Sequence, residues 1–405
     1  MNFKKSIAIL ALILVAPFFV YTKRVMDAAV MHKKMINERY WFKVLPLSVI
    51  LQKYPEISYQ KCLEKVAYDF AQFPPSNLFP HKGVCDDCFI LRIPHARVRG
   101  LRGDVFIENN LIEEMIYKNF YLGYLDMSKT DEDTVIKVAG RVAVITQDLT
   151  GYYFHWFQDV LGRLALLELQ GYEWDYLYVP YDKPYIKQTL ELWGIDPKKI
   201  ISPDSNKFCI QADEVILPSY TMNKNQGLLK YAGFHYNPVT MKYVSEKLLK
   251  AAQKKNIDTS KFSKKVFITR KNAPYRCILN EDEIFELFQD KGFVRYELGD
   301  LLIAEQILLF QNAEMIVGEH GAGLTNCLFC KPGTRVIEIF QALIDSGPWW
   351  ITQVMGMDYS CIMTVQVDAN YFAHFGVVPE IYRNAWRTKR SVSIDCIKKI
   401  VEKIN

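Results

Sequence analysis

Along most of this chain, short segments with the apolar pattern of a β-strand alternate with segments that have the apolar pattern of a helix. Strand-like runs of β-branched and aromatic residues are followed by segments whose apolar residues recur every three or four positions, as on one face of a helix. The predicted strands are 104–107, 135–146, 175–180, 200–202, 214–218, 266–269, 293–298 and 315–317, and the predicted helices are 151–171, 185–193, 241–255, 281–291, 301–311 and 394–404. Residues 73–80 are Pro-rich and are expected to form a loop, and residues 81–103 are rich in turn residues. This alternation predicts an α/β fold whose second half is a parallel, doubly wound sheet.

One unit, residues 314–340, combines a short strand, a glycine-rich turn, a helical segment and a second strand that ends near Glu338. Gly318, Gly321 and Gly323 would let a phosphate-bearing ligand approach the backbone, although their spacing is not that of a GxGxxG fingerprint. Unpaired N–H groups at a helix start form an anion site. Glu338 would lie at the carboxyl edge of the sheet, where a carboxylate commonly binds ribose hydroxyls.

Two arginines follow the strand 266–269, at the same predicted edge. Arg270 comes directly after the strand and Arg276 lies in the next loop. A guanidinium pairs bidentately with phosphate oxygens and stays charged, so the two side chains together predict a diphosphate clamp, although each alone is more often a structural ion-pair former. His320 can bond a phosphate or a leaving group, or it can satisfy a carbonyl of the core.

The helix predicted over 151–171 carries polar residues opposite its apolar stripe. His155, Asp159 and Arg163 are each four positions apart and lie on one face. A carboxylate beside a histidine orients and stabilises the charged ring, which is the usual build of a general base. The alternative interpretation is a solvated polar stripe with no chemical role.

Composition narrows the class of protein. The chain has 405 residues, half of them apolar, which is enough for two domains, and its net charge of +5 is too small to suggest a nucleic-acid binder but suits an anionic substrate. Nine cysteines are too few and too scattered for a disulfide scaffold. The pairs Cys85/Cys88 and Cys327/Cys330 are compatible with zinc or with a redox pair, Cys85/Cys88 also with a local disulfide, and Cys327 and Cys330 with buried free thiols.

The N-terminus carries an apolar segment. Residues 6–22 are uncharged and are flanked by Lys4, Lys5, Lys23 and Arg24. Such a run is near the lower limit for crossing a bilayer, about 17–25 residues, and snorkelling Lys and Arg side chains extend it. We expect an uncleaved single-pass anchor over residues 1–24, with a cleaved signal peptide or a buried helix as the alternatives.

Four stretches together resemble glycosyltransferase family 61, once called DUF563. They are ITRKNAPYRCILNEDEI, AEQILLFQNAEMIVGEHGAGLTNCLF and KPGTRVIEIF, with GYYFHWFQDVLGRLALL resembling a helix of the family's N-terminal domain. The resemblance covers roughly residues 151–340. At Glu319, relatives often carry a different residue.

The resemblance implies a GT-B fold, in which two Rossmann-like doubly wound domains face each other across a cleft. It also implies a UDP-sugar donor on the C-terminal domain and inversion at the sugar carbon. The donor-binding residues that it implies are Arg270 and Arg276 on the diphosphate, His320, Gly321, Ala322, Gly323 and Asn326 as its cradle, and Glu338 on the ribose. His155 with Asp159 as the catalytic pair is our own inference. No metal and no cofactor beyond the nucleotide sugar is expected, because positive side chains and a helix dipole can stabilise the departing diphosphate.

The function expected from these features is an inverting glycosyltransferase. It would move a sugar from a nucleotide sugar, such as UDP-GlcNAc or UDP-xylose, to a hydroxyl of a glycan or protein acceptor, at a membrane. One alternative is a non-catalytic, membrane-anchored nucleotide- or glycan-binding protein on the same fold, and another is a transferase that uses no sugar nucleotide. The expected segments are the anchor at 1–24, a stem at 25–60, an acceptor-side domain at 61–258 and a donor-side domain at 259–405, whose final helix can pack back on the N-terminal domain.

Overall fold

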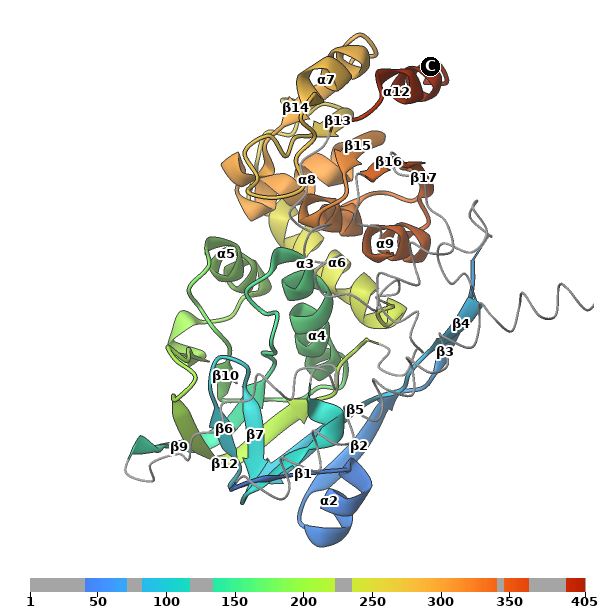
Figure 1. The fold of residues 1–405 in the computed structure, drawn as a ribbon. Coiled ribbons are helices and arrows are strands. Elements are labelled where there is room, and N and C mark those ends of the chain that lie inside the picture. The colour runs from blue at the N-terminus through green and yellow to red at the C-terminus, as the bar shows by residue number, and fades with distance from the viewer. Residues whose placement is uncertain are drawn as a thin grey trace, which may run out of the picture.

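The computed structural model of the chain describes two halves, each built around one large β-sheet (Figure 1). It describes residues 41–70, 82–116, 134–222, 235–340, 346–363 and 391–404. The expected membrane segment, residues 1–24, lies outside these ranges. Within them, no helix is both long and apolar enough to cross a bilayer.

The N-terminal half contains a ten-stranded mixed sheet in the order β1-β8-β7-β6-β12-β9-β10-β11, with β5 paired to β12 and β2 paired to β5. Its strands are β1 (Lys43–Leu45), β2 (Ser58–Leu63), β5 (Cys88–Pro94), β6 (Arg97–Arg99), β7 (Asp104–Ile107), β8 (Asn110–Ile112), β9 (Ile136–Val144), β10 (Tyr176–Tyr178), β11 (Ile200–Ile201) and β12 (Cys209–Pro218). A hairpin of β3 (Val66–Asp69) and β4 (Lys82–Cys85) forms a separate two-stranded sheet.

Only part of this first sheet agrees with the prediction. β9, β10, β11 and β12 pair in parallel, as alternation with helices predicts. The turn-rich stretch 81–103, for which no strand was predicted, contains β5 and β6, which pair antiparallel with β12, and β7 pairs antiparallel with β6. The turn after β6 joins it to β7 as a hairpin, whereas β5 and β6 follow each other along the same neighbour, β12, so turn residues did not mark the end of regular structure. The N-terminal half is therefore not a purely doubly wound sheet.

The helices of the N-terminal half include the one predicted from the apolar stripe. It consists of α3 (Tyr153–His155), a π-helical turn η4 (Trp156–Val160) and α4 (Leu161–Leu169). The other helical elements are α2 (Leu47–Lys53), η1 (Glu113–Met115), α5 (Pro184–Trp193), η5 (Pro197–Lys199) and α6 (Pro238–Gln253). Asn237 caps α6, since its side-chain oxygen accepts a hydrogen bond from the N–H of Val239 at 2.9 Å.

The C-terminal half contains a five-stranded, fully parallel sheet in the order β14-β13-β15-β16-β17. Its strands are β13 (Lys265–Ile268), β14 (Val294–Tyr296), β15 (Met315–Glu319), β16 (Arg335–Phe340) and β17 (Asp358–Met363), and its helices are α7 (Glu281–Gln289), η7 (Leu298–Asp300), α8 (Ile303–Asn312), η8 (Ala322–Phe329), α9 (Gly347–Met355) and α12 (Ile394–Val401). The strand order reverses between β13 and β15, which makes that point the topological switch where ligands of open α/β sheets bind.

Both faces of the C-terminal sheet are covered, as in a doubly wound fold. Phe267, Val317 and Ile337 pack into one apolar cluster with α7 and α12, while their strand neighbours, such as Val266 and Ile316, join a different cluster. The final helix, α12, packs on α7 and so belongs to the C-terminal half rather than to the N-terminal one.

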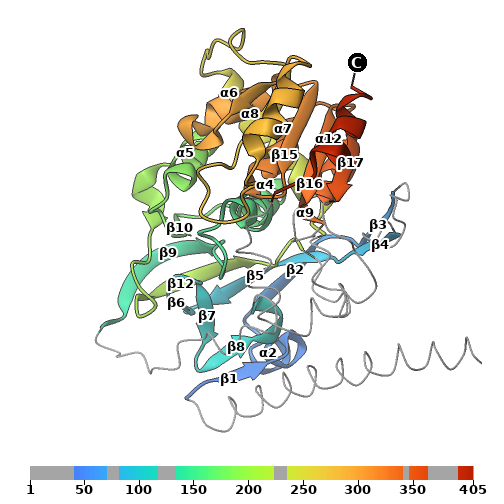
Figure 2. The same cartoon turned by 45° about the horizontal axis from the view of Figure 1, so that its top comes forward.

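The two halves share one apolar core. The apolar cluster that includes Val266 and Ile316 also contains Trp156 and Leu164 from the N-terminal half, and Ile307 and Phe329 from the C-terminal half. Helix α6 contacts α4 and α5 on one side and α8 and η8 on the other. In both ribbon views, α4 lies between the two sheets (Figures 1 and 2). This packing holds the carboxyl edge of the C-terminal sheet against α3 and α5.

Candidate functional site

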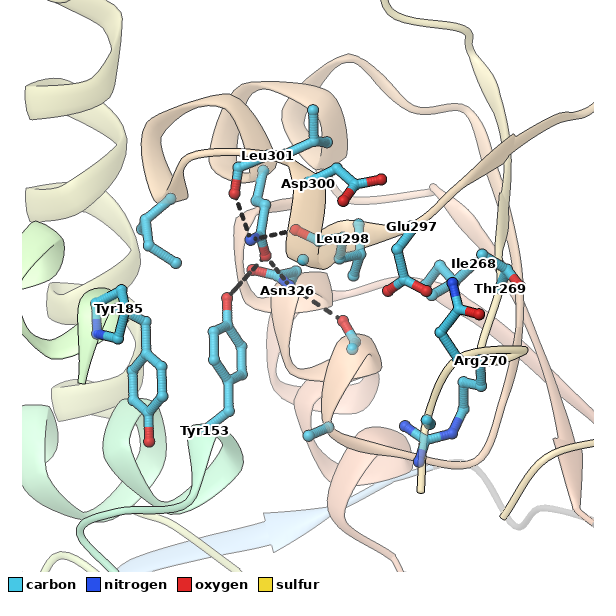
Figure 3. Close-up of a pocket in the computed structure, with 18 of the residues that line it drawn as sticks. Tyr153, Tyr185, Ile268, Thr269, Arg270, Glu297, Leu298, Asp300, Leu301 and Asn326 are labelled. Carbon is cyan, nitrogen blue, oxygen red and sulfur yellow. Dashed lines mark hydrogen bonds between the residues drawn. The ribbon is translucent and has the colours of Figure 1, made fainter. Parts of the chain in front are cut away.

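A cavity of about 580 Å³ opens where the two halves meet at the switch point. Its volume falls within the range typical of small-ligand sites, roughly 300–1,000 Å³. One wall comes from the carboxyl ends of β13, β14 and β15 and the segments that follow them, and includes Arg270, Glu297 and Glu319. The opposite wall comes from the N-terminal half, with Tyr153 on α3 and Tyr185 on α5 (Figure 3). The cavity therefore lies between the two halves, at the edge where parallel α/β sheets bind ligands.

The predicted site residues divide into two groups. Those that line the cavity are Arg270, Ala322, Gly323 and Asn326. Those absent from its lining are Arg276, His320, Gly321, Glu338, His155 and Asp159. All members of the second group lie within the described residues, and their contacts show what each one does in the folded chain.

The guanidinium of Arg270 is held by its own loop and by a glycine. Its Nη2 donates to the carbonyl of Tyr275 at 3.1 Å, and its Nε donates to the carbonyl of Arg276 at 3.3 Å. A Cβ atom added to Gly321 would lie 2.8 Å from Cζ of Arg270, so any side chain at this position would require the guanidinium to move. Gly321 thus provides the space in which the guanidinium lies.

The backbone at the exit of β13 is fixed by a carboxylate. Glu281, in the first turn of α7, accepts a hydrogen bond from the N–H of Arg270 at 3.0 Å and another from the hydroxyl of Thr269. Arg276 has a φ of +56°, a left-handed conformation that is unfavourable for a residue with a side chain. In this structure its backbone carbonyl positions Arg270, while its side chain does not line the cavity.

A hydrogen-bonded trio joins the halves inside the cavity (Figure 3). The hydroxyl oxygen of Tyr153 lies 2.8 Å from Oδ1 of Asn326 and 3.1 Å from Oε1 of Gln306. Nδ2 of Asn326 donates to Oε1 of Gln306 at 3.1 Å and to the carbonyl of Gly323 at 3.2 Å. Burial raises the pKa of Tyr153 well above its usual value, so the phenol stays protonated and donates. Both polar atoms of Asn326 therefore already have partners in the protein.

His320 and Glu338 form a buried pair. Nδ1 of His320 lies 2.6 Å from Oε1 of Glu338, and the hydroxyl of Tyr359 donates to the other carboxyl oxygen at 2.6 Å. Glu338 is fully buried. A contact with ribose hydroxyls requires a carboxylate that reaches the cavity, and Glu338 does not meet that requirement. It orients the imidazole of His320 instead.

The N-terminal half has a second pair of the same kind. Nδ1 of His155 lies 2.6 Å from Oδ2 of Asp159, and the side chain of Gln147 donates to the same oxygen at 3.3 Å. The third residue of this face, Arg163, is buried and donates to the backbone carbonyls of Thr146 and Pro218, so its role is structural. His155 keeps some exposure, 14% of its side chain, and is two residues from cavity-lining Tyr153.

The cysteine pairs are not part of the cavity. All nine cysteines are free thiols, and those of both CxxC pairs are buried. Burial raises the pKa of Cys85 and of Cys88 to about 12, which is typical of unreactive core thiols. In the described part of the chain, no group of three or more His, Cys, Asp or Glu side chains is arranged to hold a metal ion.

Sequence reasoning missed several lining residues, including Tyr185, Glu297 and Asp300. Glu297 carried a usable signal, since an acid directly after the second strand of a doubly wound sheet is the usual ribose ligand. Glu319, noted only as a departure from the family pattern, lines the cavity and is 4% exposed.

The stretch of the chain that is similar to known proteins contains the cavity. Residues 153–337 match the family model described as Glycosyltransferase 61, and every residue lining the cavity lies within that range. The EGF domain-specific O-linked N-acetylglucosamine transferase of Mus musculus is 31% identical over 100 residues, which cover 24% of this chain and 19% of that protein. The protein O-linked-mannose beta-1,4-N-acetylglucosaminyltransferase 2 of Canis lupus familiaris is 32% identical over 110 residues, which cover 26% and 18%. The matched stretch thus spans about a fifth of these relatives, and the family resemblance predicted from the motifs is confirmed.

Proposed function

Because residues 153–337 of this chain match the model of glycosyltransferase family 61, we propose that the protein transfers a sugar from a nucleotide sugar to a hydroxyl group of a glycan or protein acceptor. The observation that carries the proposal is the cavity at the switch point, which joins Arg270 and the start of η8 to a wall from the other half. The names of the relatives mention N-acetylglucosamine, so UDP-GlcNAc is the first donor to test, with UDP-xylose second.

In the proposed complex, the diphosphate lies between Arg270 and the glycine turn at Gly321–Gly323. The first N–H groups of a helix have no intrahelical partners and favour an anion, and a guanidinium pairs with phosphate oxygens. The two halves would then act as the two domains of a GT-B enzyme, with the donor on the C-terminal half. The proposed anchor at residues 1–24 would hold this unit at a membrane.

The proposed reaction is one displacement with inversion. An acceptor hydroxyl oxygen forms a bond to the anomeric carbon of the sugar while the bond from that carbon to the diphosphate oxygen breaks. His155 takes the hydroxyl proton on the nitrogen that does not face Asp159, and Asp159 stabilises the resulting imidazolium. The negative charge that develops on the departing diphosphate is met by Arg270 and the start of η8.

We propose that this reaction needs no metal. The sequence nevertheless contains one D-x-D triplet, Asp131-Glu132-Asp133, and paired carboxylates of this kind can hold a divalent cation. The triplet lies outside the described residues. Transfer assays should therefore be run with and without EDTA. Loss of transfer in EDTA would reject metal independence.

The deciding experiment compares donor binding and transfer in two arginine variants. UDP should raise the melting temperature of the wild-type protein, since a ligand of the native state stabilises it, whereas NAD should not. Arg270→Ala should lose this shift and all transfer from UDP-GlcNAc. Arg295→Ala is the matched control, because Arg295 pairs with Asp282 on the same half and does not line the cavity. No shift with UDP, GDP or CMP would reject the proposal, and a shift without any UDP release from UDP-sugars would favour the non-catalytic binding protein.

The cavity also offers a new ribose ligand in place of Glu338. Glu297 follows β14, the neighbour of β13, and its carboxylate borders the cavity near Arg270 and Thr269 (Figure 3). We expect wild-type protein to bind UDP about ten- to a hundredfold more tightly than 2′-deoxy-UDP, since a lost hydrogen bond to a charged group costs about 1.5–3 kcal/mol. Glu297→Ala should bind the two ligands equally. Equal discrimination by wild type and variant in titration calorimetry would exclude this contact.

A further inference from the structure

Glu319 is a buried carboxyl group in the wall of the proposed donor site. It is the last residue of β15, at the switch point, and it lines the cavity while only 4% of its surface is exposed. Neither of its carboxyl oxygens has a hydrogen-bond partner among the described residues. A buried polar group without a hydrogen bond lowers the stability of the folded protein by about 1–3 kcal/mol, and by more if it is charged. The presence of such a group at a ligand site indicates that its hydrogen-bond partner arrives with the ligand.

The charged groups around Glu319 come from three neighbouring segments. Arg270 and Arg276 lie in the loop after β13, His320 follows Glu319 in the chain, and Glu281 lies at the start of α7. Burial raises the pKa of Glu319, and the two arginines and His320 only partly offset this, so the pKa is about 8. At neutral pH the group is therefore a neutral carboxylic acid, which has one O–H to donate and one carbonyl oxygen.

We propose that Glu319 binds the diphosphate of the donor as a neutral acid and donates its O–H to a phosphate oxygen. The inference rests on the proposed function and adds a binding residue that the family resemblance does not supply. An ionised carboxylate would repel the phosphates in this low-dielectric site, whereas the protonated form completes the set of donors begun by Arg270 and the start of η8. The absent hydrogen-bond partner is then a phosphate oxygen.

Proton linkage gives this contact a measurable signature. The bound diphosphate stabilises the protonated form, so the pKa of Glu319 is higher in the complex than in the free protein. Below the pKa of the free protein, UDP affinity is independent of this group. Above that pKa, binding must take up one proton, so affinity falls about tenfold for each pH unit until the pKa of the complex is reached.

The test is titration calorimetry of UDP into the full-length protein at pH 7 and pH 9. Wild-type affinity should fall by about tenfold between the two pH values, and the heat at pH 9 should depend on the ionisation enthalpy of the buffer. Glu319→Gln keeps a neutral N–H donor, so its affinity should match wild type at pH 7 and stay nearly constant to pH 9. Glu319→Leu lacks any donor and should bind more weakly than Glu319→Gln at both pH values.

Glu286→Gln is the matched control, since Glu286 is an exposed carboxylate of α7 outside the cavity and its loss should leave the pH dependence intact. The same pH dependence in wild type and Glu319→Gln would overturn the inference while leaving UDP binding, and thus the proposed function, in place. Equal UDP affinity of Glu319→Gln and Glu319→Leu would also overturn it, because no hydrogen bond would then be donated. Absence of UDP binding by wild type and by every variant would overturn the inference as well, and if GDP and CMP also failed to bind, the proposed function itself would be rejected. Should the Leu variant fail to fold, the Gln variant alone decides through its pH dependence.

Discussion

At the scale of single residues, the position of each side chain near the cavity is set mostly by contacts with neighbouring residues. Arg270 is positioned by two backbone carbonyls and by the missing side chain of Gly321. Glu338 has the residue type and the place on the sheet that suggest a ribose ligand, yet His320 and Tyr359 occupy both of its oxygens. Residue type and strand position therefore did not reveal that the oxygens of Glu338 are already hydrogen-bonded within the protein.

Substituting Gly321 tests this indirect positioning. Gly321 has an extended backbone that any residue can adopt, so Gly321→Ala introduces a clash with Arg270 rather than backbone strain. We expect UDP affinity to fall about tenfold or more as the guanidinium is displaced. Gly151→Ala is the control, since a Cβ there meets no atom within 4 Å. Equal UDP affinities of the two variants in titration calorimetry would show that Gly321 does not set the position of Arg270.

At the scale of elements, the helix that carries His155 shows which structural features the spacing of residues predicts and which it does not. The spacing of four between His155 and Asp159 predicted a contact, and their side chains meet at 2.6 Å. Periodicity did not predict the π-helical turn over Trp156–Val160, which begins directly after His155. Such turns are frequent at functional sites, and they depend on packing that local spacing does not encode.

Replacement of the histidine tests the role proposed for this helix. His155→Ala should lower kcat by about a hundredfold or more, in keeping with the usual contribution of a general base, while UDP affinity stays unchanged. Asp159→Asn should lower kcat less, because the ring loses its charge partner but remains in place. Single-turnover assays with saturating donor separate these effects. A His155→Ala enzyme with near-normal kcat would reject His155 as the base.

At the scale of the whole molecule, the halves are joined both by apolar packing and by polar contacts at the cavity. One hydrophobic cluster continues from α4 through α6 to α8 and η8. Tyr153 adds a hydrogen bond across the same junction, to Asn326. A donor bound in the cavity would therefore touch both halves and would stabilise their association.

The hydroxyl of Tyr153 can be removed without changing the ring. Tyr153→Phe leaves Oδ1 of Asn326 without its donor, and a buried unsatisfied acceptor costs about 1–3 kcal/mol, so the free energy of unfolding should fall by that amount. Tyr152→Phe is the control, since Tyr152 is 59% exposed and its ring should tolerate the change. Urea unfolding followed by tryptophan fluorescence measures both variants. Equal stability would mean that the bond between the halves contributes nothing.

The sequence by itself determined the parallel C-terminal sheet, a helix with an apolar stripe over about 151–171 and the resemblance to glycosyltransferase family 61, because apolar spacing and contiguous motifs are local properties. It also placed Arg270, Ala322, Gly323 and Asn326 at the cavity, since parallel strands bring the segments after their carboxyl ends to one edge. Only the tertiary structure decided which carboxyl groups reach that cavity. The burial and hydrogen bonding of Glu338 and Glu319 depend on strands and helices distant in sequence. Among the residues that the structure describes, that packing gives the carboxylate of Glu338 hydrogen bonds from His320 and Tyr359, whereas the oxygens of Glu319 have none.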